Sequence, residues 1–332
     1  MSSKTVLVAG GGGFIGGHLV ARLRDEGYTD IRSVDIKPQD DWYQVFEDVE
    51  NVVADLKLRE ECEAACRGVS EVYNLAADMG GMGFIENNKA LCMLSVLINT
   101  HLLHAAQEAK VERYFYASSA CVYNADKQRN EAVTPLKESD AYPAMPEDGY
   151  GWEKLFSERM CRHFREDFGL ETRVARFHNV YGPYGTWDGG REKAPAALCR
   201  KVINAIETGA NEIEIWGDGQ QTRSFMYIDD CIDGIRRIMR SDVVEPLNLG
   251  SDELTTINGL AEMVEDIAGV ELKHRHNLSA PKGVNGRNSD NTLITKYLGW
   301  APSIRLRDGM ERTYRWIYEE YLKVHRGEIA RT

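Results

Sequence analysis

Two pairs of side chains in this sequence could move protons. Tyr150 and Lys154 are spaced i, i+4, so on a helix they share one face. Cys121 stands directly after Ser118-Ser119-Ala120, and Lys193 lies within the string Gly-Gly-Arg-Glu-Lys-Ala-Pro. Phenol, thiol and amine have ordinary pKa values of about 10, 8.5 and 10.4, so each needs a lowered pKa to act as a base near neutral pH. Together they would suit proton removal from a hydroxyl and from carbon.

The local sequence predicts how these groups are tuned. The Lys154 ammonium should lower the pKa of Tyr150, and Ser119 could hold the same substrate hydroxyl. Because proline is tolerated in the first turn of a helix, Pro195 predicts a helix over 192–208 with Lys193 at its start. The positive end of that helix dipole would lower the pKa of Lys193. The residues alone leave other roles equally open: core packing for the thiol, and phosphate binding or solvation for the amine.

A glycine-rich turn follows the first apolar stretch and opens a helix. Gly10, Gly13 and Gly16 allow a tight turn and let a pyrophosphate approach backbone N–H groups at the helix start. Asp35 ends the second apolar stretch, where a carboxylate can accept ribose hydroxyls and repel a 2′-phosphate. Asp55-Leu56 ends the third, at a position suited to the adenine edge. The pattern predicts a dinucleotide site that prefers NAD over NADP. The positive nicotinamide ring of bound NAD would add to the effect of Lys154 in lowering the pKa of Tyr150.

Short strands alternate with helices over the first half of the chain. Such alternation predicts an α/β fold, a Rossmann-type doubly wound parallel sheet. The expected strands are 5–9, 31–35, 51–54, 71–76, 114–118 and 172–177, and the expected helices are 13–26, 60–66, 84–109 and 150–168. We expect a dinucleotide-binding domain over 1–177, to which 225–248 returns. A smaller C-terminal substrate-binding domain over 178–325 would close over the carboxyl ends of the strands.

Composition narrows the possible partners. The 332 residues are 43% hydrophobic and 28% charged, as in soluble globular proteins, and the net charge of −12 argues against nucleic-acid binding. No apolar run approaches the roughly 18–20 residues that cross a bilayer, and the chain enters its first strand without room for a signal peptide. Seven scattered cysteines without a Cys-x-x-Cys pair indicate free thiols in a reducing, cytoplasmic compartment. The eight histidines form no ligand set, so we expect no metal.

The chain resembles the extended short-chain dehydrogenase/reductase superfamily over nearly its whole length. The resemblance is carried by the glycine turn, Asn74-Leu75-Ala76-Ala77, Asn99-Thr100, Ser118-Ser119, the Tyr150/Lys154 pair and the segment 223–230. Members of this superfamily mostly act on nucleotide sugars. With the glycine turn and strand ends, the resemblance implies an NAD site made of Gly10, Gly13, Phe14, Ile15, Gly16, Asp35, Asp55, Leu56, Ala76, Tyr150 and Lys154.

Within that superfamily the chain is most similar to the GDP-mannose 3,5-epimerase family. The strings 79–85, 118–121, 176–179, 185–187, 189–197, 216–225 and 286–291 carry this resemblance. It implies that Cys121 and Lys193 are an acid/base pair acting on C5 and C3 of the sugar. Tyr150, helped by Lys154 and Ser119, would take the C4 hydroxyl proton during a transient oxidation by bound NAD.

The resemblance also implies a GDP-sugar site. Six cations in the second half could bind pyrophosphate oxygens within an otherwise acidic chain: Arg191, Lys193, Arg200, Lys201, Arg223 and Arg287. The expected substrate-binding residues are Gly80, Ser119, Ala120, Cys121, Tyr150, Asn179, Glu192, Lys193, Ala194, Lys201, Gln221, Thr222, Arg223 and Arg287.

Three alternatives are kept open. A 4-epimerase of the same superfamily would need no acid/base pair on carbon and would stay active without the Cys121 thiol. A 4,6-dehydratase would be expected to carry Asp-Glu where this chain has Ala120-Cys121. A non-catalytic NAD-binding redox sensor would often lack the Tyr150/Lys154 pair. A homodimer is expected from the superfamily, with 84–109 and 150–168 as interface helices.

Overall fold

A seven-stranded parallel sheet forms the centre of the computed structural model, which describes residues 5–328. The strand order is β11-β6-β5-β4-β1-β2-β3. The strands are β1 (Thr5–Ala9), β2 (Ile31–Asp35), β3 (Glu50–Val53), β4 (Val69–Asn74), β5 (Arg113–Ser119), β6 (Glu171–Phe177) and β11 (Leu247–Leu249). The chain runs outward from β1 to β3 and then crosses back to β4 on the other side of β1. Ligands of such sheets bind at this reversal, outside the carboxyl ends of the strands.

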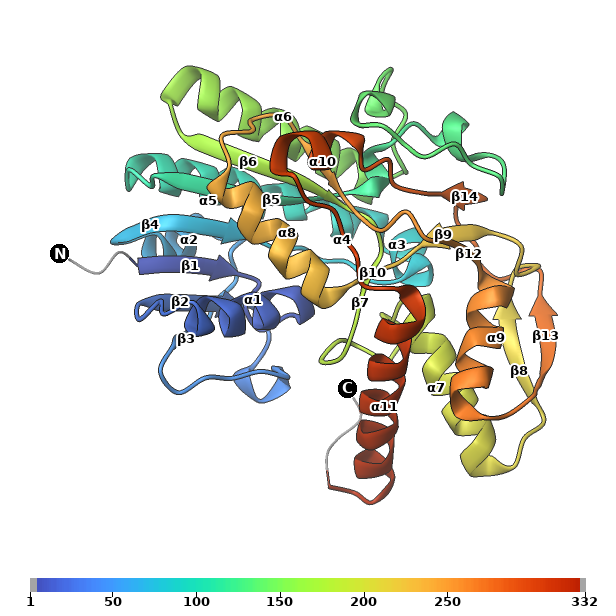
Figure 1. Ribbon diagram of the computed structural model, residues 1–332. Coiled ribbons are helices and arrows are strands. Elements are labelled where there is room, and N and C mark those ends of the chain that lie inside the picture. The colour runs from blue at the N-terminus through green and yellow to red at the C-terminus, as the bar shows by residue number, and fades with distance from the viewer. Residues whose placement is uncertain (1–4, 329–332) are drawn as a thin grey trace.

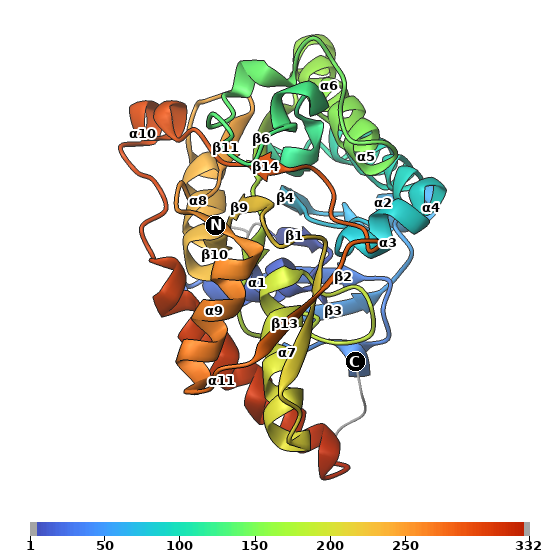
Figure 2. The same cartoon turned by 90° about the vertical axis from the view of Figure 1, so that its right-hand side faces the viewer.

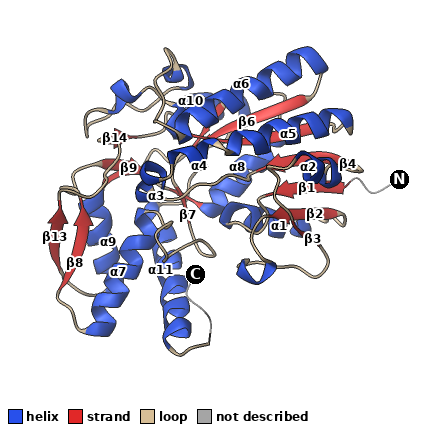
Figure 3. Ribbon diagram, turned by 180° about the vertical axis from the view of Figure 1, so that it is seen from behind, coloured by secondary structure: helices blue, strands red, loops and turns tan. Residues whose placement is uncertain are grey.

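Helices cover both faces of the sheet, as the strand–helix alternation predicts (Figures 1 and 3). One face carries α1 (Phe14–Asp25) and α8 (Ile228–Arg240), and the other carries α2 (Arg59–Ala65), α5 (Ser95–Glu108) and α6 (Tyr150–Phe168). The expected strands lie within two residues of the observed ones. The sheet therefore places Gly10, Asp35, Ser119 and Phe177 along one edge.

The expected helix over 84–109 is wrong, because it is broken into three. These pieces are α3 (Met82–Asn87), α4 (Lys89–Met93) and α5. Asn87 and Asn88 donate side-chain hydrogen bonds to the carbonyls of Gly83 and Phe84, which caps the short first helix and turns the chain.

By length and composition alone, the segment Lys89–Glu108 could cross a membrane, whereas we expect no such apolar run from the sequence. Core helices share this property. Ile98, Leu102 and Leu103 of α5 are buried, in one apolar cluster with residues of α2 and α6.

Most of the second half of the chain lies beyond the carboxyl ends of the strands, which Figure 2 views end-on, whereas α8 and β11 return to the central sheet. Its helices are α7 (Ala194–Thr208), α9 (Ile257–Ala268), α10 (Thr292–Leu298) and α11 (Leu306–His325). Its short strands pair as β8 (Glu212–Trp216) with β13 (Lys273–Asn277), β9 (Thr222–Ser224) with β12 (Leu254–Thr256) and β14 (Gly286–Arg287), and β7 (Val180–Tyr181) with β10 (Met226–Tyr227). The helix expected over 192–208 begins at Ala194, with Lys193 as its N-cap.

Candidate active site

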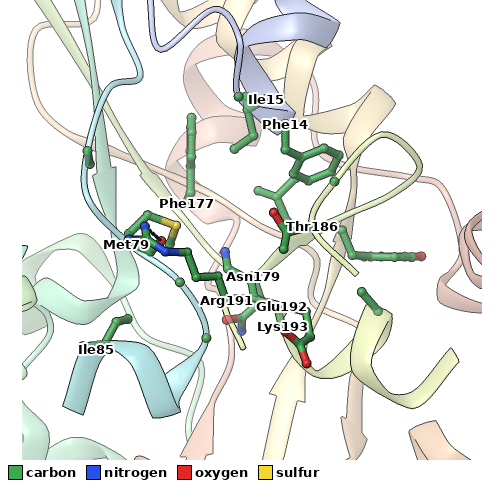
Figure 4. Close-up of a pocket in the computed structure, with 18 of the residues that line it drawn as sticks. Phe14, Ile15, Met79, Ile85, Phe177, Asn179, Thr186, Arg191, Glu192 and Lys193 are labelled. Carbon is green, nitrogen blue, oxygen red and sulfur yellow. Dashed lines mark hydrogen bonds between the residues drawn. The ribbon is translucent and has the colours of Figure 1, made fainter. Parts of the chain in front are cut away.

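One cavity of about 630 Å³ lies at the edge of the sheet between the two halves of the chain. Figure 4 shows side chains from distant segments facing it, among them Phe14 and Ile15 from α1, Phe177 from β6 and Lys193 from the start of α7. All eleven residues expected to bind the dinucleotide line this cavity. So do all the residues expected to bind substrate except Thr222.

The glycine turn gives the cavity an anion-binding end. A Cβ atom on Gly16 would lie 2.0 Å from the Gly10 carbonyl oxygen, so the turn closes only around glycine. Gly13, the N-cap of α1, offers no side-chain cap, and the first turn contains no acidic residue. The helix therefore directs uncompensated N–H groups and the positive end of its dipole at the cavity, as a pyrophosphate requires.

Asp35 stands at the end of β2 and borders the same end of the cavity. Its Oδ1 accepts a hydrogen bond from the Lys37 backbone at 3.0 Å. The Lys37 ammonium donates to the Gly12 carbonyl at 2.7 Å, which holds this cation on the backbone of the turn. The residues present thus fit a dinucleotide with free ribose hydroxyls.

Tyr150 opens α6 and packs in a small apolar cluster with Ile85, Cys92 and Cys121. Lys154 Nζ lies 5.5 Å from the centroid of its ring. The expected lowering of the phenol pKa is not found in the chain itself: burial raises the pKa of Tyr150, and charges on Cys121 and Glu153 add to this. A hydrogen bond with Ser119 acts in the opposite direction. Burial prevails because a phenolate would lose its hydration.

Cys121 lies on the short 3₁₀ turn that follows β5. Ser119 Oγ accepts a hydrogen bond from the Cys121 backbone at 3.2 Å, and Arg287 Nη1 donates to the thiol sulfur at 3.4 Å. Burial raises the pKa of the thiol, and the Glu147 carboxylate raises it further. Arg287 and Ser119 oppose this rise. The thiol is therefore held mainly in its protonated form near neutral pH.

Lys193 borders the cavity from the other half of the chain. Its pKa is lowered, as expected from its place at a helix start, but the main cause is burial of the ammonium. The charge on Cys121 opposes this lowering, so the two side chains interact electrostatically across the cavity. Across the cavity, a thiol with a raised pKa thus faces an amine with a lowered pKa.

The loop before Lys193 bridges the two halves of the chain. Gly81 N donates to the Arg191 carbonyl at 3.0 Å, and the Arg191 guanidinium stacks 3.9 Å from the centroid of the Phe84 ring. Glu192 accepts a hydrogen bond from Arg200 at 2.8 Å and another from the Gly190 backbone at 2.7 Å. These contacts fix the backbone from which Lys193 projects.

Two buried arginines line the substrate end. Arg223 donates to backbone carbonyls, and burial, reinforced by the charge of Arg287, lowers its pKa to about 9. Neighbouring Thr222 points away from the cavity and donates to the Glu131 carbonyl. Alternation along β9 explains this difference, because successive side chains of a strand face opposite sides. The expectation for Thr222 therefore does not agree with its position.

Three further residues expected to bind substrate lie in the wall of the cavity and donate hydrogen bonds to backbone carbonyls. Lys201 Nζ donates to the Glu214 carbonyl at 2.7 Å, and burial lowers its pKa. Asn179 adopts a φ of +41° and donates to the Ser224 carbonyl at 3.1 Å. Gln221 donates to the Trp216 carbonyl at 2.9 Å. Sequence reasoning missed Glu147 and Gln128, which contact Arg287 from positions 140 and 159 residues away, and no local pattern marks them.

Comparison with known proteins places this site in a family. The family model described as NAD dependent epimerase/dehydratase family matches residues 6–250. GDP-mannose 3,5-epimerase 1 of Oryza sativa subsp. japonica is 49% identical over 96% of this chain and 82% of its own length. The chain belongs to the GDP-mannose 3,5-epimerase family. The Arabidopsis thaliana GDP-mannose 3,5-epimerase is 48% identical over 96% of the chain and 83% of its own length.

Solved structures confirm the fold expected of a GDP-mannose 3,5-epimerase family member. A UDP-glucose 4-epimerase from Thermotoga maritima superposes with a TM-score of 0.85 at 24% identity, covering 96% of this chain and 99% of its own. A UDP-glucuronic acid 4-epimerase from Bacillus cereus, in complex with UDP-glucuronic acid and NAD, gives 0.81 at 24% identity, covering 96% and 100%. Among residues 5–328, no group of three or more His, Cys, Asp or Glu side chains is arranged to hold a metal ion.

Proposed function

We propose that this chain epimerises GDP-mannose at C3 and C5 to give GDP-L-galactose, with GDP-L-gulose when only C5 is inverted. The observation that carries the proposal is the meeting of Cys121 and Lys193 in the cavity that also contains Tyr150, Lys154 and the glycine turn. A simple 4-epimerase would need only Tyr150, Lys154 and the glycine turn, and no acid/base pair on carbon. Family membership supports the same reading.

In the proposed cycle Tyr150 removes the C4 hydroxyl proton, with Lys154 and Ser119 holding the phenol and the hydroxyl. Bound NAD supplies the chemistry of accepting the C4 hydride and returning it. Once C4 is a ketone, the hydrogens on C3 and C5 are acidic because they are α to a carbonyl. Cys121 and Lys193 then remove and deliver protons at these carbons from opposite faces.

Isotope exchange tests this proposal directly. Turnover of GDP-mannose in heavy water should place deuterium at C5 and C3 of the recovered product and none at C4, because the hydride returns without exchange. Label at C4 would contradict the cycle. Cys121→Ala should abolish exchange at C5 and C3, whereas a 4-epimerase would keep full activity in that variant.

We also propose that the chain forms a homodimer through α4, α5 and α6. Apolar side chains are exposed on these neighbouring helices: Met93, Leu94, Leu97, Trp152 and Phe156. Burial of such a patch against a second copy would remove apolar surface from water. Analytical ultracentrifugation should show a dimer for the parent chain and a monomer for Phe156→Glu. Leu278→Glu, at an exposed site in the other half of the chain, should remain dimeric.

We further propose a division into an NAD-binding domain, 1–177 with 225–248, and a substrate-binding domain, 178–325. The strand order supports it, because β11 joins the central sheet beside β6 whereas β8, β9 and β14 do not. A cytoplasmic enzyme without nucleic-acid or membrane partners is proposed as well. The net charge of −12 and the seven unpaired cysteines support that location.

A further inference from the structure

Inversion at carbon leaves the acid/base pair in a changed protonation state. One group has gained the proton removed from the sugar, and the other has lost the proton delivered to it. Repeated turnover therefore requires that protons leave one group and return to the other. Lys193 is partly accessible where it borders the cavity, but Cys121 is only 6% exposed. The thiol needs a proton partner of its own.

Glu147 is placed to be that partner. Its backbone N–H donates to the Cys121 carbonyl at 2.9 Å, and its Oε2 accepts a hydrogen bond from Arg287 Nη2 at 3.3 Å. The same guanidinium donates from Nη1 to the Cys121 sulfur at 3.4 Å. Arg287 thus bridges the thiol and the carboxylate, and a third contact, from its Nε to Gln128 at 2.7 Å, fixes its plane.

The free oxygen of Glu147 distinguishes a relay from a simple ion pair. Its Oε1 is buried and has no hydrogen-bond donor within residues 5–328. The side chain as a whole is 17% exposed, so Glu147 reaches the solvent more than Arg287, whose side chain is 6% exposed. Gly151 keeps the segment close: a Cβ there would lie 2.3 Å from the Cys121 carbonyl oxygen and 3.1 Å from the Glu147 Cβ.

We propose that Glu147 relays protons between Cys121 and water, a role that rests on the proposed function. After the thiol has delivered its proton to the sugar, the thiolate remains beside Arg287. Glu147 takes up a proton from the solvent, to which Lys193 releases the proton that it removed from the sugar. The O–H bond of the protonated Glu147 then breaks as the S–H bond forms, and the carboxylate is regenerated. The reverse transfer removes a proton that Cys121 has taken from carbon. Glu147 acts through the thiol and never on the sugar.

The charge of Glu147 also raises the pKa of the Cys121 thiol, on top of the larger effect of burial. The other titratable or charged groups that interact with Cys121 come from four further elements. They are Tyr150 of α6, Lys193 at the start of α7, Arg223 of β9 and Arg287 of β14. Glu147 is the one carboxylate among these five groups. Its removal should therefore lower the pKa of the Cys121 thiol.

The test compares the parent enzyme with Glu147→Gln, using Asp148→Asn as the matched control. Asp148 is the next carboxylate along the chain, but it is exposed and paired with Lys89. Iodoacetamide labelling of Cys121, followed by mass spectrometry from pH 6 to 10, should give the parent an apparent pKa above the ordinary thiol value of about 8.5. Glu147→Gln should lower that value and speed labelling at neutral pH about tenfold. Deuterium incorporation at C5 and C3 should slow at least about tenfold, because an amide cannot carry the proton.

Asp148→Asn should match the parent in both assays, and Glu147→Asp should recover part of the lost exchange. An unchanged labelling profile or an unchanged exchange rate in Glu147→Gln would overturn the relay. If that variant does not fold, Glu147→Asp decides: its shorter side chain should slow exchange relative to the parent, and an unchanged rate would overturn the inference. A parent enzyme that incorporates no deuterium at C5 or C3 would instead refute the proposed function, and labelling would still report the action of Glu147 on the thiol.

Discussion

Glu158 and Arg176 form a buried ion pair next to the end of β5, and its removal is the most demanding test of how the site is supported. The two side chains are 4% and 3% exposed, and Arg176 donates to both carboxylate oxygens, at 2.9 and 2.7 Å. Ser118, next to Ser119, also donates to Glu158 Oε1 at 2.5 Å. The pair therefore joins α6 to β6 and to the end of β5.

Glu158→Gln should cost about 3–5 kcal/mol of unfolding free energy, because it leaves the Arg176 charge buried without its counter-ion. With a urea m-value of about 3 kcal/mol/M for a chain of this size, the unfolding midpoint should fall by roughly 1–1.7 M. Glu166→Gln on the same helix is the matched control. Glu166 pairs with Arg162 at 2.7 Å, but both side chains are at least 40% exposed. Exposed pairs contribute about 0–1 kcal/mol, so its midpoint should fall by less than roughly 0.3 M.

Urea unfolding followed by far-UV circular dichroism measures both variants under one set of conditions. Equal shifts for Glu158→Gln and Glu166→Gln would refute the reasoning, because they would mean that burial does not govern the cost of breaking these pairs. A large loss confined to Glu158→Gln, with a lower rate of C4 oxidation, would show that the pair also positions Ser119.

Two further predictions concern the cofactor turn and the buried histidine. Gly16→Ala should weaken NAD retention at least about tenfold, because its Cβ would lie 2.0 Å from the Gly10 carbonyl; equilibrium dialysis checks this. Gly17→Ala, whose Cβ would meet only the flexible Gln44 side chain at 3.1 Å, should bind NAD as before. Burial lowers the pKa of His178 to about 3. Below about pH 6.5 its imidazole is therefore protonated in the unfolded chain but stays neutral in the folded chain. The free energy of unfolding should therefore decrease as the pH is lowered, and this residue should account for about 2 kcal/mol of the decrease between pH 7 and pH 5. Urea titrations should show a shallower pH dependence for His178→Gln, and an identical slope would contradict the assignment.

Features that depend on local spacing can be predicted from the order of the residues alone. Gly10, Gly13 and Gly16 predicted the turn, because only residues without a Cβ can pack so closely. Tyr150 and Lys154 were expected on one helix face, and the period of the helix alone places them there. Asp35 is recognised because it ends an apolar strand and Cys121 because it comes just after one, and the ends of parallel strands share one edge.

Features that depend on packing between distant segments become visible only in the folded chain. The pKa of Tyr150 rises although a lysine is near, because the surrounding cluster withholds water from a phenolate. Thr222 faces away while Arg223 faces inward, since the register of β9 is set by its neighbours β12 and β14. Arg287 and Glu147 reach Cys121 from 166 and 26 residues away, and no local spacing encodes such a contact. Burial and long-range contact arise only when the chain has folded, and these two quantities set the protonation of the groups in the site.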